Sequence, residues 1–484
     1  MTVRSVEPKS LWNHFADLNA IPRPSKKEER VIQFMMNFGK SLGLETLKDE
    51  IGNVIIRKPA SPGMEDRQMV ILQSHLDMVH QKNRETDFDF DNEGIKMRVN
   101  GDWIDADGTT LGADNGIGVA TIMATLSSND IEHPALEAFF TIDEETGMTG
   151  AKEMDGSMFQ GEILLNLDTE DDDELSIGCA GGIDTNTEYS YQEEELSEDR
   201  KSFQLSIKGL LGGHSGMDID SGRGNANKWL ARILWSINQK LELQIISFDG
   251  GGLRNAIPRE ASCVISIFAK DVNNFKDIVQ QMTDTYREEY KSIETNMEIL
   301  LSEQPSITKG LSVKESQKII NTLAAVHNGV YRMSPDIDGL VETSSSLARV
   351  EIGNGKFTTQ SLQRSSVNST RDEVAMTIKA CFENMGCTVV QSGEYPGWQP
   401  NPNSKILDIM EQLYKKMFRE DPQVKACHAG LECGILGEHL PDVDMISFGP
   451  NIRAAHSPDE KVQISSVQKF WKFYLETLKS IPVK

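Results

Sequence analysis

The sequence predicts an α/β protein in which one α/β domain is interrupted by a second one. Two observations carry this prediction. Short apolar runs alternate with helical patterns along the chain, and two polar, turn-rich stretches divide it into three parts. A chain of 484 residues is also longer than one compact core usually accommodates.

The first part of the chain alternates helices with strands. Helices are predicted over residues 10–19 and 26–42, the second ending at Gly43, and small apolar residues predict a buried helix over 117–126. Short apolar runs predict the strands 53–57, 69–74, 136–142 and 163–168. Short strands separated by helices are typical of a sheet that is largely buried.

Two stretches mark the limits of an insertion. Residues 191–200 (YQEEELSEDR) are acidic and typical of a solvated linker, and residues 394–403 (EYPGWQPNPN) are rich in proline and glycine. We therefore expect an interrupted domain at 1–186 and 396–484, with an inserted domain at 187–395.

Within the insertion, a pattern of strands and helices occurs twice. The first copy consists of the predicted elements 203–207, 225–241, 243–247, 261–268 and 272–292. The second copy consists of 357–362, 370–385 and 387–392. The inserted domain is therefore predicted to contain two similar α/β halves. Helices predicted over 404–418 and 465–481 complete the interrupted domain.

The composition narrows the class of function. The 74 acidic and 49 basic residues give a formal charge of −25, which repels nucleic acid and anionic membranes. No apolar stretch is long enough to span a bilayer, and no signal-peptide pattern opens the sequence, so a cytoplasmic protein without a membrane partner is expected. The six cysteines form no C-x-x-C pair, which argues for reduced packing residues and against a thiolate zinc site.

Histidines and acids recur where predicted strands end. The strand 69–74 leads into His75 and Asp77, which a period of two places on one face. A carboxylate there can orient the imidazole or support a metal-bound water. Asp114 stands just before the helix 117–126, where it either caps that helix or lies at the mouth of the sheet, the usual ligand site of open α/β folds.

Three consecutive acids follow the predicted strand 136–142. Asp143, Glu144 and Glu145 would repel one another at the end of a buried strand, and a nearby cation would offset that repulsion. Adjacent glutamates can also divide the work, one binding a metal and the other moving protons. The alternative is an exposed acidic turn.

The same arrangement occurs twice more. Asp168 ends the predicted strand 163–168, and His456 follows a short apolar run at 446–448. Two imidazoles and three carboxylates form a ligand set that suits zinc and is compatible with manganese or cobalt. One bridging carboxylate would hold two ions about 3.5–4 Å apart. Spacing alone leaves open which carboxylate bridges.

Seven strings in this order resemble the aminoacylase-like family of co-catalytic zinc peptidases, and most nearly its aminoacyl-histidine dipeptidase branch. The strings are SHLDMV (74–79), GTTLGADNGIG (108–118), DEETGMTGA (143–151), NLDTE (166–170), GGHSG (212–216), HAGLECG (428–434) and AAHSPDE (454–460). The resemblance spans nearly the whole chain. It implies a mixed-sheet catalytic domain that binds two zinc ions, with the insertion as a lid domain.

The resemblance also implies roles for the metal-binding positions. Asp114 is implied as the bridging ligand. His75 and Asp168 would complete one metal site, and Glu145 and His456 the other.

Further roles follow from the same resemblance. Glu144 would be the general base that takes a proton from the attacking water, and Asp77 would orient His75. His214 would stabilise the oxyanion, where a well-aimed donor contributes about 3–4 kcal/mol; the alternative is a loop histidine held by neighbouring glycines. Asn255 and Arg364 would hold the substrate.

Some assignments stay open. Paired hydrogen bonds from an arginine suit a peptide's terminal carboxylate, and either Arg364 or Arg371 could supply them. His80 and His428 are expected to pack near the site without binding a metal. A substrate-side role for Glu432 is left open.

The expected activity is metal-dependent hydrolysis of unblocked dipeptides, with a preference such as β-alanyl-histidine implied only by the name of the branch. An amidohydrolase of N-acyl amino acids with the same metal centre is one alternative. A non-catalytic metal-binding relative is another. The expected partner is a small peptide substrate, and both a monomer and a homodimer are compatible with the resemblance.

Overall fold

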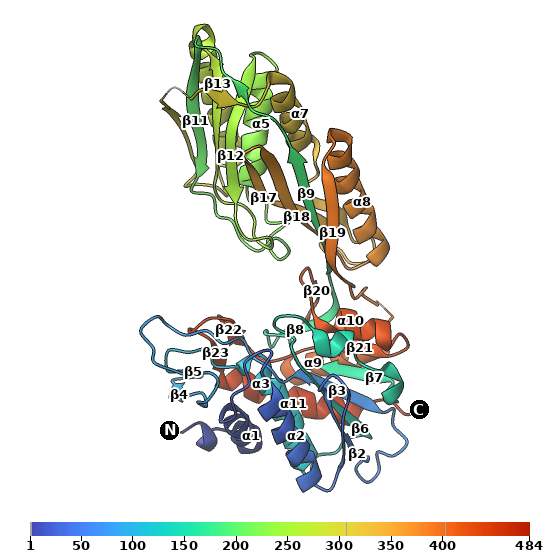
Figure 1. Ribbon diagram of the computed structural model, residues 1–484. Coiled ribbons are helices and arrows are strands. Elements are labelled where there is room, and N and C mark those ends of the chain that lie inside the picture. The colour runs from blue at the N-terminus through green and yellow to red at the C-terminus, as the bar shows by residue number, and fades with distance from the viewer. Residues whose placement is uncertain (1, 306, 402) are drawn as a thin grey trace. The chain divides into compact units, whose positions relative to one another are not determined.

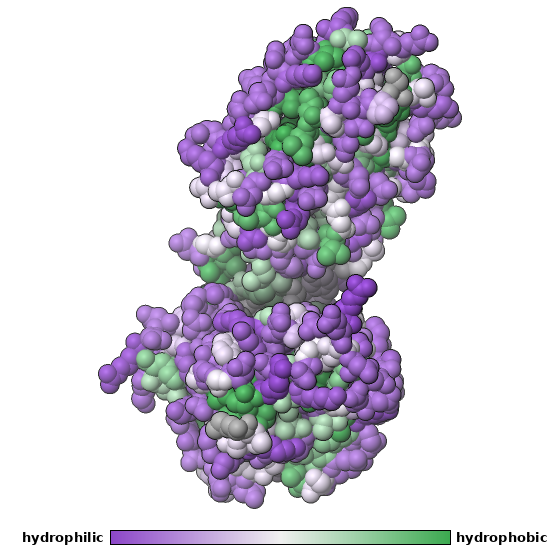
Figure 2. All heavy atoms as spheres, turned by 90° about the vertical axis from the view of Figure 1, so that its left-hand side faces the viewer, coloured by the Kyte–Doolittle hydropathy of each residue, from purple (hydrophilic) through white to green (hydrophobic). Residues whose placement is uncertain are grey.

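The computed structural model describes residues 2–305, 307–401 and 403–484, so Pro402 of the predicted boundary stretch lies outside the described residues. Within the described ranges, no helix combines the length and the apolar character needed to cross a bilayer. Hydrophilic side chains dominate the face shown in Figure 2, in keeping with the net charge of −25.

The chain divides into two compact units (Figure 1). The first unit consists of Met1–Gly178, Pro400–Ala426 and Leu431–Lys484, and the second of Cys179–Gln399 and Cys427–Gly430. Residues 427–430 belong to the second unit because of their contacts with residues far away in the sequence. Their own composition gives no sign of this. The limits of the inserted domain at residues 187 and 395 remain a prediction.

A mixed eight-stranded sheet forms the framework of the first unit, in the order β1-β2-β6-β3-β7-β21-β8-β20. Its strands are β1 (Glu45–Lys48), β2 (Val54–Lys58), β3 (Val70–His75), β6 (Leu136–Thr141), β7 (Ile163–Asn166), β8 (Glu174–Cys179), β20 (Gln423–Cys427) and β21 (Asp444–Ser447). The central strands β6, β3, β7 and β21 run parallel. Every residue of β3 and β6 is buried, which explains their largely apolar sequences.

Helices of the first unit pack with this sheet. They are α1 (Lys9–Asn19), α2 (Glu29–Ser41), α3 (Ala113–Ser127), α4 (Thr149–Lys152), α9 (Lys405–Phe418), α10 (Glu432–His439) and α11 (Ile464–Ser480), with short 3-10 turns at Val3–Ser5 and Gly156–Met158. The predicted buried helix is confirmed as α3, which lies against β3. A Cβ at Gly118 would stand 2.4 Å from Ser74 Oγ, so this close approach requires glycine.

The predicted helix 26–42 starts later than expected. Helix α2 begins at Glu29, because Lys26 adopts a left-handed backbone with φ of 68° and Lys27 N–H closes a turn onto the Pro24 carbonyl. The helical side-chain pattern extended across this turn, so the sequence placed the start too early.

A second, four-stranded sheet in the first unit has the order β22-β23-β5-β4. Its strands are β4 (Met97–Asn100), β5 (Trp103–Ala106), β22 (Ile452–Arg453) and β23 (Lys461–Gln463). Strand β23 pairs with β5, so the loop 454–460 between β22 and β23 is tied to a segment more than 300 residues earlier in the sequence.

The second unit is built on a nine-stranded antiparallel sheet in the order β14-β11-β13-β12-β17-β18-β9-β19, with β16 also pairing with β17. Its strands are β9 (Gly181–Ser190), β11 (Arg200–Lys208), β12 (Leu243–Gly251), β13 (Ala261–Phe268), β14 (Glu298–Glu303), β16 (Gly329–Met333), β17 (Val341–Gly353), β18 (Lys356–Ser365) and β19 (Thr388–Tyr395); β10 (Glu194–Glu195) and β15 (Lys309–Gly310) form a separate pair. Its helices are α5 (Ala226–Asn238), α6 (Val272–Glu289), α7 (Val313–Ala325) and α8 (Asn368–Met385), preceded at α6 by a 3-10 turn at Ala269–Asp271.

Two βαββαβ halves make up this sheet. One half is β11-α5-β12-β13-α6-β14, and the other is β9-α7-β17-β18-α8-β19. In both, the first strand lies between the third and the fourth, and the halves join where β12 pairs with β17. The first half is inserted between β9 and α7 of the second half, so the repeat is nested rather than tandem.

The sequence missed two central strands of the second half. Strands β9 and β17 are rich in serine, threonine and asparagine, yet most of β17 is buried. Several of their hydroxyl groups form hydrogen bonds across the sheet, as in Thr185–Gln363 at 2.6 Å and Thr187–Thr359 at 2.7 Å. Reading apolar runs cannot find a strand whose buried face is polar.

The core of the second unit gives a test of the fold. Ile265 in β13 is fully buried between register partners Phe203 of β11 and Ile245 of β12. We expect Ile265→Ala to lower the free energy of unfolding by about 2–5 kcal/mol, measured by chemical or thermal unfolding. The control is Val390→Ala on β19, where the side chain is 56% exposed and little change is expected. Equal effects of the two variants would contradict this packing.

Candidate metal centre

Three neighbouring parallel strands end at the same edge of the main sheet and carry four of the predicted site residues. His75 is the last residue of β3, Asp168 follows β7, and Glu144 and Glu145 follow β6. The carboxyl ends of parallel strands are the usual place for ligands in α/β proteins.

Two further residues come from loops. Asp114 lies in the first turn of α3, where it interrupts the helical dihedrals and makes no side-chain cap. This decides between the two sequence readings, because its carboxylate instead faces imidazoles. His456 lies on the loop between β22 and β23 with φ of 63°.

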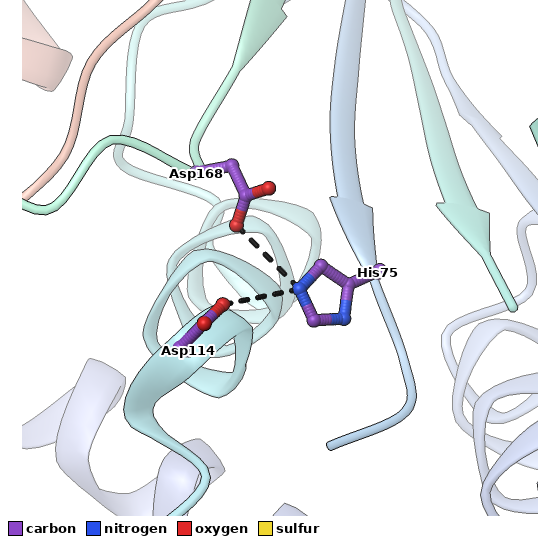
Figure 3. Close-up of side chains that lie close together, drawn as sticks. All are labelled: His75, Asp114 and Asp168. Carbon is purple, nitrogen blue, oxygen red and sulfur yellow. Dashed lines mark hydrogen bonds and ion pairs between the residues drawn. The ribbon is translucent and has the colours of Figure 1, made fainter. Parts of the chain in front are cut away.

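Asp114 lies between two histidines. Its Oδ1 is 3.1 Å from His75 Nε2, and its Oδ2 is 3.2 Å from His456 Nε2. His75 Nε2 is also 3.6 Å from Asp168 Oδ1, and His456 Nε2 is 3.0 Å from Glu145 Oε2. Figure 3 shows the carboxylates of Asp114 and Asp168 pointing toward one nitrogen of His75. The two clusters therefore share one carboxylate.

The side chains fit divalent metal ions. Potential ligand atoms lie within 4.8 Å of one another in three groups: His75–Asp114–Asp168, Asp114–Glu145–His456 and His75–Glu144–Glu145. Glu145 Oε1 and Asp168 Oδ1 are buried, and neither has a hydrogen-bond partner among the described residues. Buried carboxylate oxygens without donors are costly, and a cation would satisfy them.

The pKa values of the site reflect this crowding of charge. Burial raises the pKa of Asp168 to about 6, opposed by His75. Burial also raises the pKa of Glu144 well above its usual value, and the carboxylates of Asp168, Glu432 and Glu145 add to the shift. Hydrogen bonds to Asp114 and Glu145 raise the pKa of His456 to about 11. These shifts favour the protonated forms of the side chains, so metal ions and protons compete for them.

Asp77 connects the first histidine to the acidic loop. Its carboxylate lies 3.4 Å from His75 Nδ1 and accepts hydrogen bonds from the backbone N–H groups of Glu144 and Glu145 at 3.0 and 3.3 Å. Ser25 Oγ donates a fourth contact at 2.7 Å. Asp77 is fully buried, so it can orient His75 without binding a metal itself.

Asp143, the first of the three acids, has a different role. It forms an ion pair with Lys26 at 3.0 Å and accepts hydrogen bonds from the hydroxyl groups of Thr146 and Thr149. It therefore shapes the turn, while Glu144 and Glu145 belong to the candidate metal centre.

The loop carrying Asp114 is held by a buried carboxylate that the sequence indicated only as part of AAHSPDE. Glu460 accepts hydrogen bonds from the backbone N–H groups of residues 111–114 at 2.7, 2.9, 2.7 and 3.2 Å. It is 2% exposed, and burial raises its pKa while these backbone donors oppose the shift. A negative charge at this helix N-terminus is also favourable.

Arg23, which the sequence did not indicate, ties two segments of the site together. Its guanidinium donates to the carbonyls of Leu76 and Asp77 at 3.0 Å each and to the Gly112 carbonyl at 2.6 Å. Burial lowers its pKa to about 10, which leaves it charged at neutral pH. Its partners are backbone carbonyls and the side-chain amide of Asn19, so no spacing of acidic residues could have revealed it.

Glu170 is a further, half-buried acid near these residues. Burial raises its pKa to about 8, and the charges of Asp114 and Asp168 add to the shift. Its string NLDTE was noticed in the sequence, but no role followed from it.

The remaining predicted site residues lie in the second unit. His214 Nδ1 accepts hydrogen bonds from the backbone N–H groups of Gly216 and Met217 at 3.2 and 3.0 Å, which leaves the ring proton on Nε2. Burial lowers the pKa of His214, and Arg364 adds to the shift. Asn255 is exposed, and its backbone carbonyl accepts a hydrogen bond from the backbone N–H of Ser215 at 2.8 Å.

The structure distinguishes the two candidate arginines. Arg371 is bound by Asp372 at 2.8 Å, by Glu394 and by the carbonyl of Tyr395. Arg364 donates to Tyr395 Oη at 2.9 Å, and its buried Nε has no partner among the described residues. Arg364 therefore retains hydrogen-bonding capacity that Arg371 lacks.

Two histidines of the matching strings lie apart from the ligands. His80 is exposed and contacts the edge of Phe90, with ring centroids 5.8 Å apart. His428 belongs to the second unit, where its Nε2 is 2.8 Å from Ser344 Oγ, and burial lowers its pKa to about 3. A Cβ at Gly216 would stand 2.0 Å from the His428 carbonyl oxygen, which explains the last glycine of GGHSG.

An α/β sheet with two imidazole–carboxylate clusters that share an aspartate is the architecture of a metallohydrolase. The chain belongs to peptidase family M20/M25/M40, whose model matches residues 71–480. It is 40% identical over 479 residues to the cytosol non-specific dipeptidase of Escherichia coli (strain K12), and the match covers 99% of both chains.

Solved structures agree with this membership. The crystal structure of aminoacylhistidine dipeptidase from Vibrio alginolyticus matches with a TM-score of 0.95 and 41% identity, over 100% of this chain and 99% of that one. Aminopeptidase PepT from Bacillus cereus matches with a TM-score of 0.56 and 16% identity, over 98% and 99% of the two chains, and shares the fold. The predicted resemblance and the α/β fold with an inserted domain are confirmed.

The anchoring of Asp114 gives a test of the candidate centre. Glu460→Gln replaces one carboxylate oxygen by an N–H₂ group, which cannot accept hydrogen bonds from the backbone N–H groups of residues 111–114. The Asp114 loop should therefore lose its fixed position. We expect the affinity for zinc or manganese to fall by about 10–100-fold, measured by titration of chelated protein. The matched control is Asp459→Asn, an exposed neighbour whose replacement should leave the affinity unchanged. Unchanged affinity in folded Glu460→Gln would contradict the anchoring role.

Proposed function

We propose that this protein is a metal-dependent dipeptidase that hydrolyses the peptide bond of unblocked dipeptides. The observation that carries the proposal is that His75 and His456 both contact the carboxylate of Asp114. Glu144 also lies close enough to Glu145 and Asp168 for their charges to raise its pKa. Full-length similarity to a cytosol non-specific dipeptidase supports the substrate class.

Five side chains would hold two divalent ions. Asp114 would bridge them, His75 and Asp168 would complete one site, and Glu145 and His456 the other. Zinc is the proposed metal, because imidazole and carboxylate donors suit it; manganese and cobalt accept the same ligands. Two bound ions would polarise the scissile carbonyl and lower the pKa of the attacking water.

Glu144 would move the proton. Its carboxylate would accept a proton from the attacking water and deliver it to the nitrogen of the leaving amine. The backbone N–H of Glu144 is held by Asp77, which fixes the start of this side chain relative to His75. A general base must be held within hydrogen-bond reach of its proton, and this contact supports that role.

His214 would stabilise the oxyanion of the tetrahedral intermediate. Because Nδ1 accepts two backbone N–H groups, Nε2 carries the proton and can donate to developing negative charge. The lowered pKa keeps the ring neutral, so it donates without delivering its proton.

Arg364 would bind the terminal carboxylate of the dipeptide, with Asn255 as a second polar contact. The unpaired Nε of Arg364 supports this assignment over Arg371. A planar guanidinium presents two parallel donors to a carboxylate.

Several finer features belong to the same proposal. The substrate is a small peptide, and a histidine in the second position is suggested by the name of the Vibrio alginolyticus relative. A cytoplasmic location is suggested by the name of the Escherichia coli relative. The protein would act as a monomer or a homodimer.

Hydrolysis of a dipeptide panel tests the proposal. Chelated protein should be inactive, and zinc or manganese should restore cleavage of unblocked dipeptides, including β-alanyl-histidine. N-acetylated amino acids serve as the comparison, since preferential cleavage of them would favour an amidohydrolase. Glu144→Gln is the matched variant: it should bind both metals and lose turnover by about 10²–10⁴-fold. Absence of cleavage in wild-type protein that binds two ions would contradict the proposal.

The carboxylate contact can be tested separately. Arg364→Lys keeps the charge and loses the paired donors, so KM for dipeptides should rise by about tenfold or more with a smaller change in kcat. Dipeptide amides, which lack the terminal carboxylate, should be cleaved equally by both proteins. A loss that is the same for free dipeptides and their amides would refute the assigned contact.

A further inference from the structure

A row of buried polar side chains crosses the parallel strands just before the candidate metal ligands. Thr141 of β6, Gln73 of β3, Asn166 of β7 and Ser447 of β21 form this polar row, and all four are at most 1% exposed. Gln73 is the register partner of Asn166, and Asn166 is the register partner of Ser447. Such a row inside an otherwise apolar sheet requires an explanation, because each polar group must be satisfied there.

Hydrogen bonds along the polar row run in one direction. Thr169 Oγ1 lies 2.8 Å from Ser447 Oγ, the Ser447 hydroxyl donates to Asn166 Oδ1, and the Asn166 amide donates to Gln73 Oε1. Because Ser447 uses its only hydroxyl hydrogen toward Asn166, Thr169 must be the donor to Ser447.

Glu432 receives the end of this chain. Gln73 Nε2 and Thr141 Oγ1 both donate to Glu432 Oε2 at 2.7 Å, and Gln73 Nε2 also lies 3.1 Å from Thr141 Oγ1. Glu432 is the first residue of α10 and is fully buried. Oε2 of Glu432 accepts both hydrogen bonds, so it decides which way the Gln73 amide faces.

The direction of the row bears on the metal ligands. Successive residues on one face of a strand are two apart, so His75 follows Gln73 on the same face of β3. Asp168 lies two residues beyond Asn166, the last residue of β7. A reversed Gln73 amide would place its oxygen against Glu432 and its N–H₂ against the Asn166 amide. The resulting repulsion would act directly beside the residues that carry His75 and Asp168.

Fold stability alone does not account for a carboxylate at this position. Glu432 Oε1 is buried without a hydrogen-bond partner among the described residues. Burial raises the pKa of Glu432 to about 7, opposed by His75, so the charged form is disfavoured there. A neutral side chain of similar size would avoid this penalty.

We propose that Glu432 is a positioning residue for the metal centre, which sets the direction of the polar row and through it the places of His75 and Asp168. Among the described residues, its hydrogen bonds go to Gln73 and Thr141 rather than to the candidate ligands. It acts through Gln73 and Asn166, and it affects one of the two proposed metal sites more than the other. The effect on turnover rests on the proposed function, whereas the effect on metal binding does not.

Two substitutions of Glu432 test the proposal. Glu432→Leu removes the acceptor, whereas Glu432→Gln retains an oxygen that can face Gln73 and Thr141. For Glu432→Leu we expect one of the two zinc-binding steps to weaken by about tenfold or more, while the other stays within twofold. At saturating zinc, kcat should fall with little change in KM, and Glu432→Gln should restore most of both properties. Glu438→Leu, an exposed position on the same helix, is the control.

The outcomes separate the alternatives. Equal weakening of both zinc steps, together with a lower melting temperature, would overturn the proposal in favour of a purely structural role, and so would behaviour identical to Glu438→Leu. Where Glu432→Leu does not fold, Gln73→Leu breaks the polar row at one link and must give the same asymmetric loss. Unchanged zinc binding in folded Gln73→Leu would overturn the proposal. Failure of wild-type protein to cleave dipeptides would refute the proposed function and leave the zinc result standing.

Discussion

One carboxylate between two imidazoles is the constraint on which the rest of this structure depends. Asp114 reaches His75 with one oxygen and His456 with the other, although these residues come from three distant segments. Holding them together means burying several like charges, which is unfavourable without a cation. The surrounding residues hold these side chains together in spite of that repulsion. Glu460 fixes the Asp114 loop through backbone N–H groups, and Arg23 fixes it through a backbone carbonyl.

The parallel strands and the loops contribute differently. Strands β6, β3 and β7 deliver His75, the two glutamates and Asp168 to one edge of the sheet, because parallel strands end together. The β22–β23 loop delivers His456, and its position depends on the pairing of β23 with β5. The polar row crosses the sheet just before these ends. A rigid sheet therefore sets one half of the candidate centre, and anchored loops set the other.

Whether a strand could be recognised in the sequence depended on the polarity of its buried side chains. Largely apolar runs identified β3, β6 and β7, because both faces of these strands are buried. Strand β17 was missed, since the buried run Thr343–Ser346 separates its apolar residues. Helix α7 was also missed, although Ser312 caps the N–H of Glu315 at 3.1 Å and supplies a recognisable start signal. Patterns of hydrophobicity thus find apolar burial and overlook polar burial.

By itself, the sequence determined the α/β class, the insertion and the set of residues at the candidate centre, because strand ends and short motifs are local properties. Only the tertiary structure decided that Asp114 faces two histidines and that Asp143 turns to Lys26 instead. It also decided that Arg371 is ion-paired, whereas Nε of Arg364 has no hydrogen-bond partner among the described residues. It alone revealed Arg23, Glu460 and the row ending at Glu432. These residues act through contacts to backbone or across strands, and such contacts depend on distance in space, which the spacing of residues along the chain does not encode.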